Sequence, residues 1–250
     1  MNKYLKNLDR IEFVVTMNCT GRCRHCSEGS HFPDKRHIDG AIASYVIEKV
    51  TSVYDIRSVM TFGGEPLLYL SDVSAIHKAA KMVGIPRREI ITNGFFTNDK
   101  EKIASAAYLL ADSGVTRVML SVDAFHQETI PIEPVFYFAE CIRASGVVIE
   151  LHPAWLVSRE DINPYNDRTR QLLDSFSNRG FDISDGNVIF PKGNALIHLA
   201  EYFNGNDPVT DPYEESSDDI HSLCIGHDGS VLQGNINTDD ILDIIKNYEP

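Results

Sequence analysis

The chain has 250 residues, of which 43% are hydrophobic and 24% charged, and its formal net charge is −13. This length can bury one sizeable core, so we expect one main globular domain. The acidic balance disfavours nucleic acid as the main partner, because phosphates repel a negative surface. Five cysteines without an apolar secretory segment or a membrane span disfavour a disulfide framework, so we expect a cytoplasmic protein.

Strand-like and helix-like runs alternate along the chain, which is typical of βαβ units and a mainly parallel sheet. We expect six strands, over residues 11–16, 59–62, 89–92, 118–122, 147–151 and 188–190. The first helix should begin at Asp39 and bury the stripe Ile42, Val46, Val50 and Val53. Further helices are expected around residues 73–83, 103–110, 134–145, 172–176 and 196–203. Residues 207–219 lack periodicity and read as an acidic loop, and Thr238 is the expected N-cap of a last helix.

Three cysteines follow the first predicted strand within eight residues, as Cys19, Cys23 and Cys26. Three thiolates can hold three corners of a 4Fe–4S cluster and leave one iron open for chemistry. Structural zinc is the alternative, but it normally needs four protein ligands. His25 lies between two cysteines, where we expect that it can hardly reach the same ion.

Polar and glycine-rich groups follow the next three strands, at the edge where parallel α/β folds build their sites. Each group alone also fits an ordinary turn. Gly63 and Gly64 would let the backbone approach an ammonium group, and Glu65 adds negative charge there. Short hydrogen-bonding side chains suited to a ribose follow strands three and four. The residues concerned are Gly63-Gly64-Glu65-Pro66, Thr92-Asn93-Gly94, Ser121, Asp123 and His126.

Together, the Cys-x3-Cys-x2-Cys pattern and these groups resemble the radical S-adenosylmethionine superfamily over about residues 10–200. The resemblance implies a partial (β/α)6 barrel and two cofactors, one 4Fe–4S cluster and S-adenosylmethionine, with an electron donor such as flavodoxin or ferredoxin. It implies reductive cleavage of the cofactor to a 5′-deoxyadenosyl radical that abstracts hydrogen from a substrate. By the same resemblance His25 lies near the adenine. The resemblance further implies that the motif Gly63-Gly64-Glu65-Pro66 binds the cofactor amino group, and that Thr92, Asn93, Ser121 and Asp123 contact its ribose and methionine parts.

The tail from Phe190 to Tyr248 resembles the segment that precedes an auxiliary-cluster domain in peptide-modifying SPASM-like enzymes. Pro191-Lys192-Gly193-Asn194-Ala195, Cys224 and Asp228-Gly229-Ser230-Val231 stand in the matching places. Leu232, Gln233 and Gly234 occupy the region of the next cysteines, so we expect a single cluster. We therefore divide the chain into a barrel, residues 1–205, and a degenerate SPASM-like tail, residues 206–250, with an acidic linker, a short hairpin and a helix. Cys141 is expected to be buried in its helix.

The resemblance favours an enzyme that modifies a peptide or small protein, by epimerisation or cross-link formation. It suggests Cys224 as a catalytic hydrogen donor, and a small apolar residue of the tail without a catalytic role is the alternative for Cys224. A mutase or synthase for a small metabolite is an alternative. A tRNA or nucleoside modifier is disfavoured by the acidic charge. A non-enzymatic iron–sulfur electron carrier would need the cysteine loop but not the glycine pair, the ribose-like polar groups or six βα units.

Overall fold

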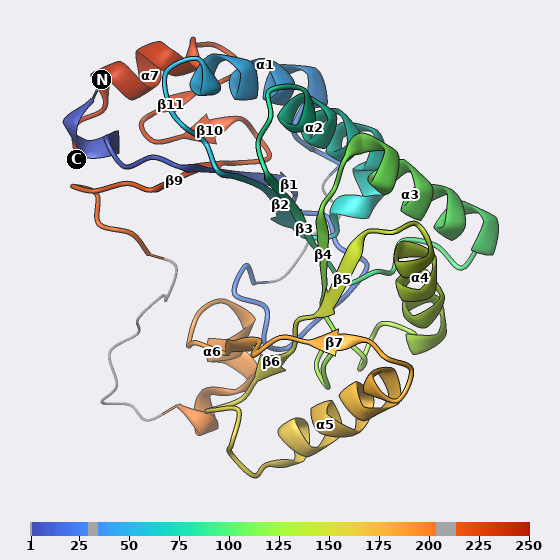
Figure 1. Ribbon diagram of the computed structural model, residues 1–250. Helices are drawn as coiled ribbons and strands as arrows, with labels where there is room; N and C mark the ends of the chain where they lie inside the picture. The colour runs from blue at the N-terminus through green and yellow to red at the C-terminus, as the bar shows by residue number, and fades with distance from the viewer. Residues whose placement is uncertain (1, 30–34, 204–213) are drawn as a thin grey trace.

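The protein is built around one curved parallel sheet with helices along its outer side (Figure 1). The computed structural model describes residues 2–29, 35–203 and 214–250. Six strands lie side by side in chain order, and a seventh, β9 (Ser222–Ile225), pairs in parallel with the other side of β1. The six are β1 (Arg10–Thr16), β2 (Ser58–Gly63), β3 (Arg87–Thr92), β4 (Arg117–Leu120), β5 (Val148–Leu151) and β7 (Asp182–Ile183).

Five helices connect these strands and form the outer layer. They are α1 (Gly40–Thr51), α2 (Leu70–Met82), α3 (Lys100–Ser113), α4 (Ile132–Ala144) and α5 (Pro164–Ser177). Asp39 caps α1 as expected, because its side chain accepts from the N–H groups of Ala41 and Ile42. Among the described residues, β7 and β9 are the two edges of the sheet and do not pair with each other. The parallel strand order and the outer helices confirm the predicted α/β fold with a partial (β/α)6 barrel. None of the helices in the described ranges combines the length and the apolar character needed to cross a membrane.

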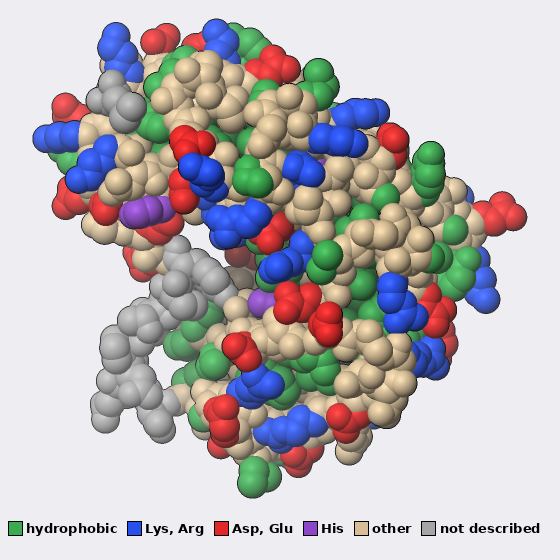
Figure 2. All heavy atoms as spheres, viewed as in Figure 1, with side chains coloured by type: hydrophobic (Ala, Val, Ile, Leu, Met, Phe, Trp, Pro, Cys, Tyr) green, Lys and Arg blue, Asp and Glu red, His purple; other side chains and the backbone are tan. Residues whose placement is uncertain are grey.

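The two faces of the sheet differ in character because strand side chains alternate. In β1, Ile11, Phe13 and Val15 are fully buried against the helices, whereas Glu12 and Val14 are only half-buried on the inner side. Figure 2 shows charged side chains of both signs along the hollow between the two halves of the molecule. The inner side of the partial barrel is therefore the more polar and accessible one.

The sixth strand was predicted in the wrong place. Its position in the main sheet is taken by β7, whereas β8 (Asn187–Val188) pairs with β6 (Ala154–Trp155) in a separate two-stranded sheet. The residues of β7 form a short run with one apolar member, too short to stand out by periodicity. The more apolar residues 188–190 have the stronger strand pattern, but the first of them belongs to β8, which pairs with β6, just after β5, and not with β5 itself.

The tail joins the barrel through β9, a strand that was not predicted. It ends in a hairpin of β10 (Ser230–Val231) and β11 (Gly234–Asn235) and in α7 (Ile241–Asn247), as expected. The cap of α7 is Asp240 rather than Thr238, because the Asp240 carboxylate accepts from the N–H of Leu242 at 2.8 Å. Of the predicted acidic loop, residues 207–213 lie outside the described residues, and residues 214–219 contain no helix or strand. The division at residue 205 stays a prediction.

Three smaller differences from the sequence predictions concern helix bounds and burial. Val53 lies beyond the last residue of α1 and is 44% exposed, so it does not belong to the buried stripe. Cys141 lies in α4 but is half-buried. The predicted helix near residue 200 is split into α6 (Asn194–His198) and the 3-10 turn η3 (Ala200–Tyr202). Two more 3-10 turns are η1 (Lys3–Leu5) and η2 (Pro66–Tyr69).

His77 is a fully buried histidine that links α2 to β2. Its Nε2 lies 2.9 Å from Thr61 Oγ1, and burial, with a smaller effect of Arg88, lowers its pKa to about 3. The unfolded chain takes up this proton near pH 6.5, so the stabilisation is present above that pH and is lost as pH falls. We expect the free energy of unfolding to lose about 2 kcal/mol from this group between about pH 7.5 and pH 5.

Urea titrations of wild type and His77→Gln test this, because glutamine can keep a hydrogen bond to Thr61 but does not titrate. The loss of stability between the two pH values should be about 2 kcal/mol smaller in the variant. Met82→Gln is the control, because Met82 is 81% exposed at the end of the same helix and carries no titrating group, so its loss between the two pH values should equal that of wild type. An equal loss in wild type and His77→Gln would contradict the prediction.

Candidate active site

The three sequence-predicted cluster ligands lie on one loop after β1. Cys23 is buried, and Cys19 and Cys26 are half-buried. Burial, with negative charge on Glu65 and Cys26, raises the pKa of Cys19 to about 11. Burial also raises the pKa of Cys23, with contributions from Asp123 and the other two sulfur atoms. A bound metal ion would lower these thiol pKa values, because its positive charge stabilises thiolates and releases their protons. The loop therefore has the donor chemistry of a metal site.

The glycine pair after β2 holds the start of this loop. The N–H of Gly64 donates to Thr16 O at 2.7 Å, and the N–H of Glu65 donates to Asn18 O at 2.8 Å. A Cβ on Gly64 would lie 2.2 Å from Asn18 O, and Gly63 has a φ of +127° that favours glycine. The close approach that these glycines permit is thus made by the chain leading into Cys19.

Gly64→Ala is expected to displace the cysteine loop, since the added methyl group would overlap the Asn18 carbonyl. We expect iron bound per chain after anaerobic reconstitution to fall by about tenfold, as for lost supporting contacts of a metal site. Iron and protein assays measure this. Gly84→Ala is the control: its φ of +83° makes alanine strained there, but no atom lies within 4 Å of an added Cβ, so the variant should lose stability and keep its iron loading. Equal iron loading in both variants would contradict the predicted role.

Glu65 ties the ends of β2 and β3 together. It is fully buried, and its carboxylate accepts from Thr92 Oγ1 at 2.7 Å and from the N–H of Asn93 at 2.9 Å. A third donor is a backbone N–H in η2, which begins at Pro66. Burial raises its pKa to about 7 against the opposing effect of these hydrogen bonds. Asn93 Nδ2 lies 3.6 Å from Cys19 Sγ, so this strand end also contacts the loop.

Asp123 organises the turn after β4. Its Oδ1 accepts from the N–H groups of Phe125 and His126, both at 3.0 Å, and its Oδ2 accepts from the N–H of Ala154 at 3.1 Å and lies 2.7 Å from His126 Nδ1. Burial alone would raise the pKa of Asp123, but His126 and these hydrogen bonds hold it well below its usual range. Ser121, two residues earlier, is buried at the same strand end. Asp123 thereby fixes the position of His126.

His126 was predicted only as one of the polar residues that follow the fourth strand, without a role of its own. Its ring centroid lies 4.8 Å from that of His25, and ligand atoms of His25, His126 and Cys23 lie within 4.8 Å of one another. His25 is therefore within reach of an ion held by Cys23, contrary to the expectation from its place between two cysteines. The spacing of Asp123 and His126, three residues apart after a strand, was the available signal.

The far end of the cysteine loop is held by the chain after β8. The N–H of Asn194 donates to Cys26 O at 2.9 Å, and Asn194 Nδ2 donates to Cys23 O at 3.1 Å. Gly193 has a φ of +57°, and a Cβ there would lie 2.3 Å from Ser27 O. The Pro-Lys-Gly-Asn-Ala segment thus supports the loop from the opposite side.

Cys224 lies apart from this cluster of contacts, on β9. It is opposite Glu12 in the parallel register, so both side chains point to the inner side of the sheet. The residue is exposed, while partial burial of its thiol together with Glu12 and Glu28 raises the pKa to about 11. The thiol therefore keeps its hydrogen at neutral pH.

The sequence model of the radical SAM superfamily matches residues 13–195. The chain belongs to this superfamily. Its expected cofactors are those of the superfamily, a 4Fe–4S cluster and S-adenosylmethionine. The cysteine loop, which offers three thiols and no fourth cysteine nearby in the sequence, fits such a cluster.

Curated relatives in this superfamily carry the name GTP 3′,8-cyclase. The protein of Clostridium perfringens is 27% identical over 173 residues, covering 65% of this chain and 50% of the relative. The protein of Campylobacter fetus is 23% identical over 255 residues, covering 98% of this chain and 65% of the relative. The chain thus spans less than two thirds of the length of these relatives.

Solved structures support the fold. Native anSMEcpe with bound AdoMet superposes with a TM-score of 0.59 at 14% identity, covering 96% of this chain and 80% of that one. HydG, a maturase of the [FeFe]-hydrogenase, gives a TM-score of 0.51 at 14% identity, covering 76% and 45%. At these identities the likeness concerns the fold alone.

Proposed function

We propose that Cys19, Cys23 and Cys26 hold a single cluster, and that the enzyme modifies a peptide or small protein on the inner side of the barrel. When bound, the cluster and S-adenosylmethionine supply reductive carbon–sulfur cleavage and hydrogen abstraction from a substrate. The chain's own residues position the cysteine loop from three sides, through Gly64, Asn93 and Asn194. A donor such as flavodoxin or ferredoxin would supply the electron.

Cys224 carries the proposal for the substrate. It presents a protonated thiol to the inner side, where a substrate can enter. Return of a hydrogen atom from a second position is what an epimerisation needs, because the C–H bond broken on one face is remade on the other. The thiol gives up its hydrogen atom to the substrate radical in this step and becomes a thiyl radical. One electron from the electron donor and one proton from solvent restore the thiol.

A nucleotide substrate is the second candidate, favoured by the curated relatives named GTP 3′,8-cyclase. The charges on the inner face speak against a triphosphate. Arg10 pairs with Glu12 at 2.6 Å, and Arg117 lies 3.7 Å from both Glu89 and Glu150. Both arginines are thus already paired. These five side chains comprise three carboxylates and two guanidinium groups, so their sum is negative. A peptide, above all a cationic one, is better matched to this lining.

Both candidates can be tested with the same reduced, reconstituted protein. Cationic and anionic synthetic peptide pools and GTP are added separately in deuterated water, and 5′-deoxyadenosine and substrate mass are measured. We expect cationic peptides to raise 5′-deoxyadenosine formation and to gain one deuterium, which Cys224→Ala should abolish, with Cys141→Ala as control. Stimulation by GTP with none by peptides would refute the peptide proposal. Unchanged deuterium incorporation in Cys224→Ala would refute the donor role.

A further inference from the structure

A column of aromatic rings connects the first turn of α5 with the cysteine loop. Tyr165 stacks on Phe125, with ring centroids 4.8 Å apart and planes at 18°. Phe125 is fully buried and contacts the His25 ring at 5.0 Å. The Tyr202 ring also contacts the Tyr165 ring in an edge-on geometry, with centroids 6.0 Å apart and planes at 81°. The column therefore couples the position of α5 to that of His25, the residue directly before Cys26.

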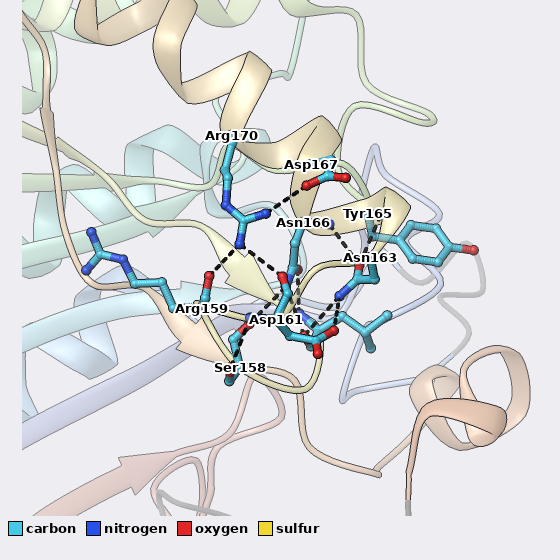
Figure 3. Close-up of polar contacts among 9 residues, drawn as sticks. Ser158, Arg159, Asp161, Asn163, Tyr165, Asn166, Asp167 and Arg170 are labelled. Atoms are coloured by element: carbon cyan, nitrogen blue, oxygen red, sulfur yellow. Dashed lines mark hydrogen bonds and ion pairs between the residues drawn. The ribbon is translucent and has the colours of Figure 1, made fainter.

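The outer end of this column is fixed by the polar network in Figure 3. Asn166 is fully buried, and its Nδ2 donates to three carbonyl oxygens of the loop 156–161 at 2.8 to 3.1 Å. Asn163 caps the helix by accepting from the N–H groups of Tyr165 and Asn166. Figure 3 shows the Tyr165 ring pointing away from this network. The backbone of the turn is therefore held while the ring remains available to Phe125.

Two further contacts clamp α5 to the residues around His25. The N–H of Ala124 donates to Thr169 Oγ1 at 3.0 Å, one helical turn after Tyr165. The Arg24 guanidinium lies 5.1 Å from the centre of the Tyr165 ring, and its Nε donates to Glu128 Oε2 at 2.9 Å. The helix is thus tied to both chain segments that border the column.

We propose that Tyr165 is a positioning residue for His25, and that the ring column sets how the cysteine loop presents His25 to bound S-adenosylmethionine. Nδ1 of His25 is buried without a hydrogen-bond partner among the described residues. The orientation of the ring therefore depends on its contacts with Phe125 and His126. The inference rests on the proposed cluster site.

The test compares Tyr165→Leu, which keeps apolar bulk but loses the ring, with Tyr165→Phe, which keeps the ring. Binding of S-adenosylmethionine to the reconstituted protein is measured, together with the EPR spectrum of the reduced cluster with and without it. We expect Tyr165→Leu to weaken binding roughly two- to tenfold and to alter the spectral change on binding. Tyr165→Phe should bind within about twofold of wild type. Tyr108→Leu is the control, because Tyr108 is 72% exposed on α3.

Wild-type affinity and spectra in Tyr165→Leu would overturn the inference, and so would an equal loss in Tyr165→Phe, because the ring would then not matter. If the wild-type protein holds a cluster and binds S-adenosylmethionine, the proposed cluster site stands, and either of these results counts against the role of Tyr165 alone. A wild-type protein without a cluster would overturn the proposed site and this inference together. Urea midpoints within the range of the Tyr108→Leu control exclude general unfolding as the cause.

Discussion

Cys23→Ala is expected to abolish cleavage of S-adenosylmethionine and most iron binding. Cys23 is the middle and most buried member of the trio, 8% exposed, and its backbone carbonyl accepts from Asn194. A cluster left with two thiolates loses a protein ligand that no other cysteine of the loop can replace. We expect 5′-deoxyadenosine formation with dithionite as reductant to fall more than about 100-fold, beyond the effect of a supporting contact. Chromatography of the product and iron assays measure both losses.

The matched control for this experiment is Cys141→Ala, since Cys141 lies in α4, away from the loop. It should keep iron content and cleavage rate, with a loss of about 1 kcal/mol in the free energy of unfolding. Cleavage at the wild-type rate in Cys23→Ala would show that the cysteine loop is not the cluster site. A wild-type protein with a cluster but no cleavage would instead favour the electron-carrier interpretation.

Most of the barrel could be predicted from the sequence because its strands and helices carry strong periodicity. The strand at Arg10–Thr16 and the cap at Asp39 are where local patterns put them. β7 and β9 were missed because each is short and is stabilised by a neighbour distant in sequence. β9 adds to β1, more than 200 residues earlier. Such pairing leaves no local signature.

The sequence predicted which residues of the site lie close together, but it predicted their contacts less well. Cys19, Gly64, Asn93 and Asp123 do converge on one end of the sheet. The sequence suggested that the glycine pair lets the backbone approach a ligand. The structure adds a contact that was not predicted, because Gly64 lies against Asn18 and Gly63 against Thr16. Close packing between chain segments far apart in sequence decides this, and residue types alone do not encode it. The cofactor contacts of these residues stay predictions.

Asp123→Ala is expected to cost about 3–5 kcal/mol in the free energy of unfolding at neutral pH, because it leaves buried donors without an acceptor. Those donors are the N–H groups of Phe125, His126 and Ala154. The pKa of Asp123 is held below its usual value, so its stabilisation is present above about pH 4 and is lost as the pH falls further. The difference between wild type and variant should therefore shrink in acid. Urea titrations at several pH values measure it.

The variant Asp123→Asn tests whether Asp123 affects the binding of S-adenosylmethionine separately from its effect on stability. The amide oxygen can still accept from Phe125 and His126, but its NH2 group faces the N–H of Ala154, so we expect a smaller loss of about 1–3 kcal/mol. Because Asp123 orients His126 beside His25, affinity for S-adenosylmethionine should fall about tenfold even in this folded variant. Asp112→Ala, an exposed control on α3, should change stability by less than about 0.5 kcal/mol. Wild-type affinity in Asp123→Asn would confine Asp123 to a stabilising role and remove His126 from the cofactor site.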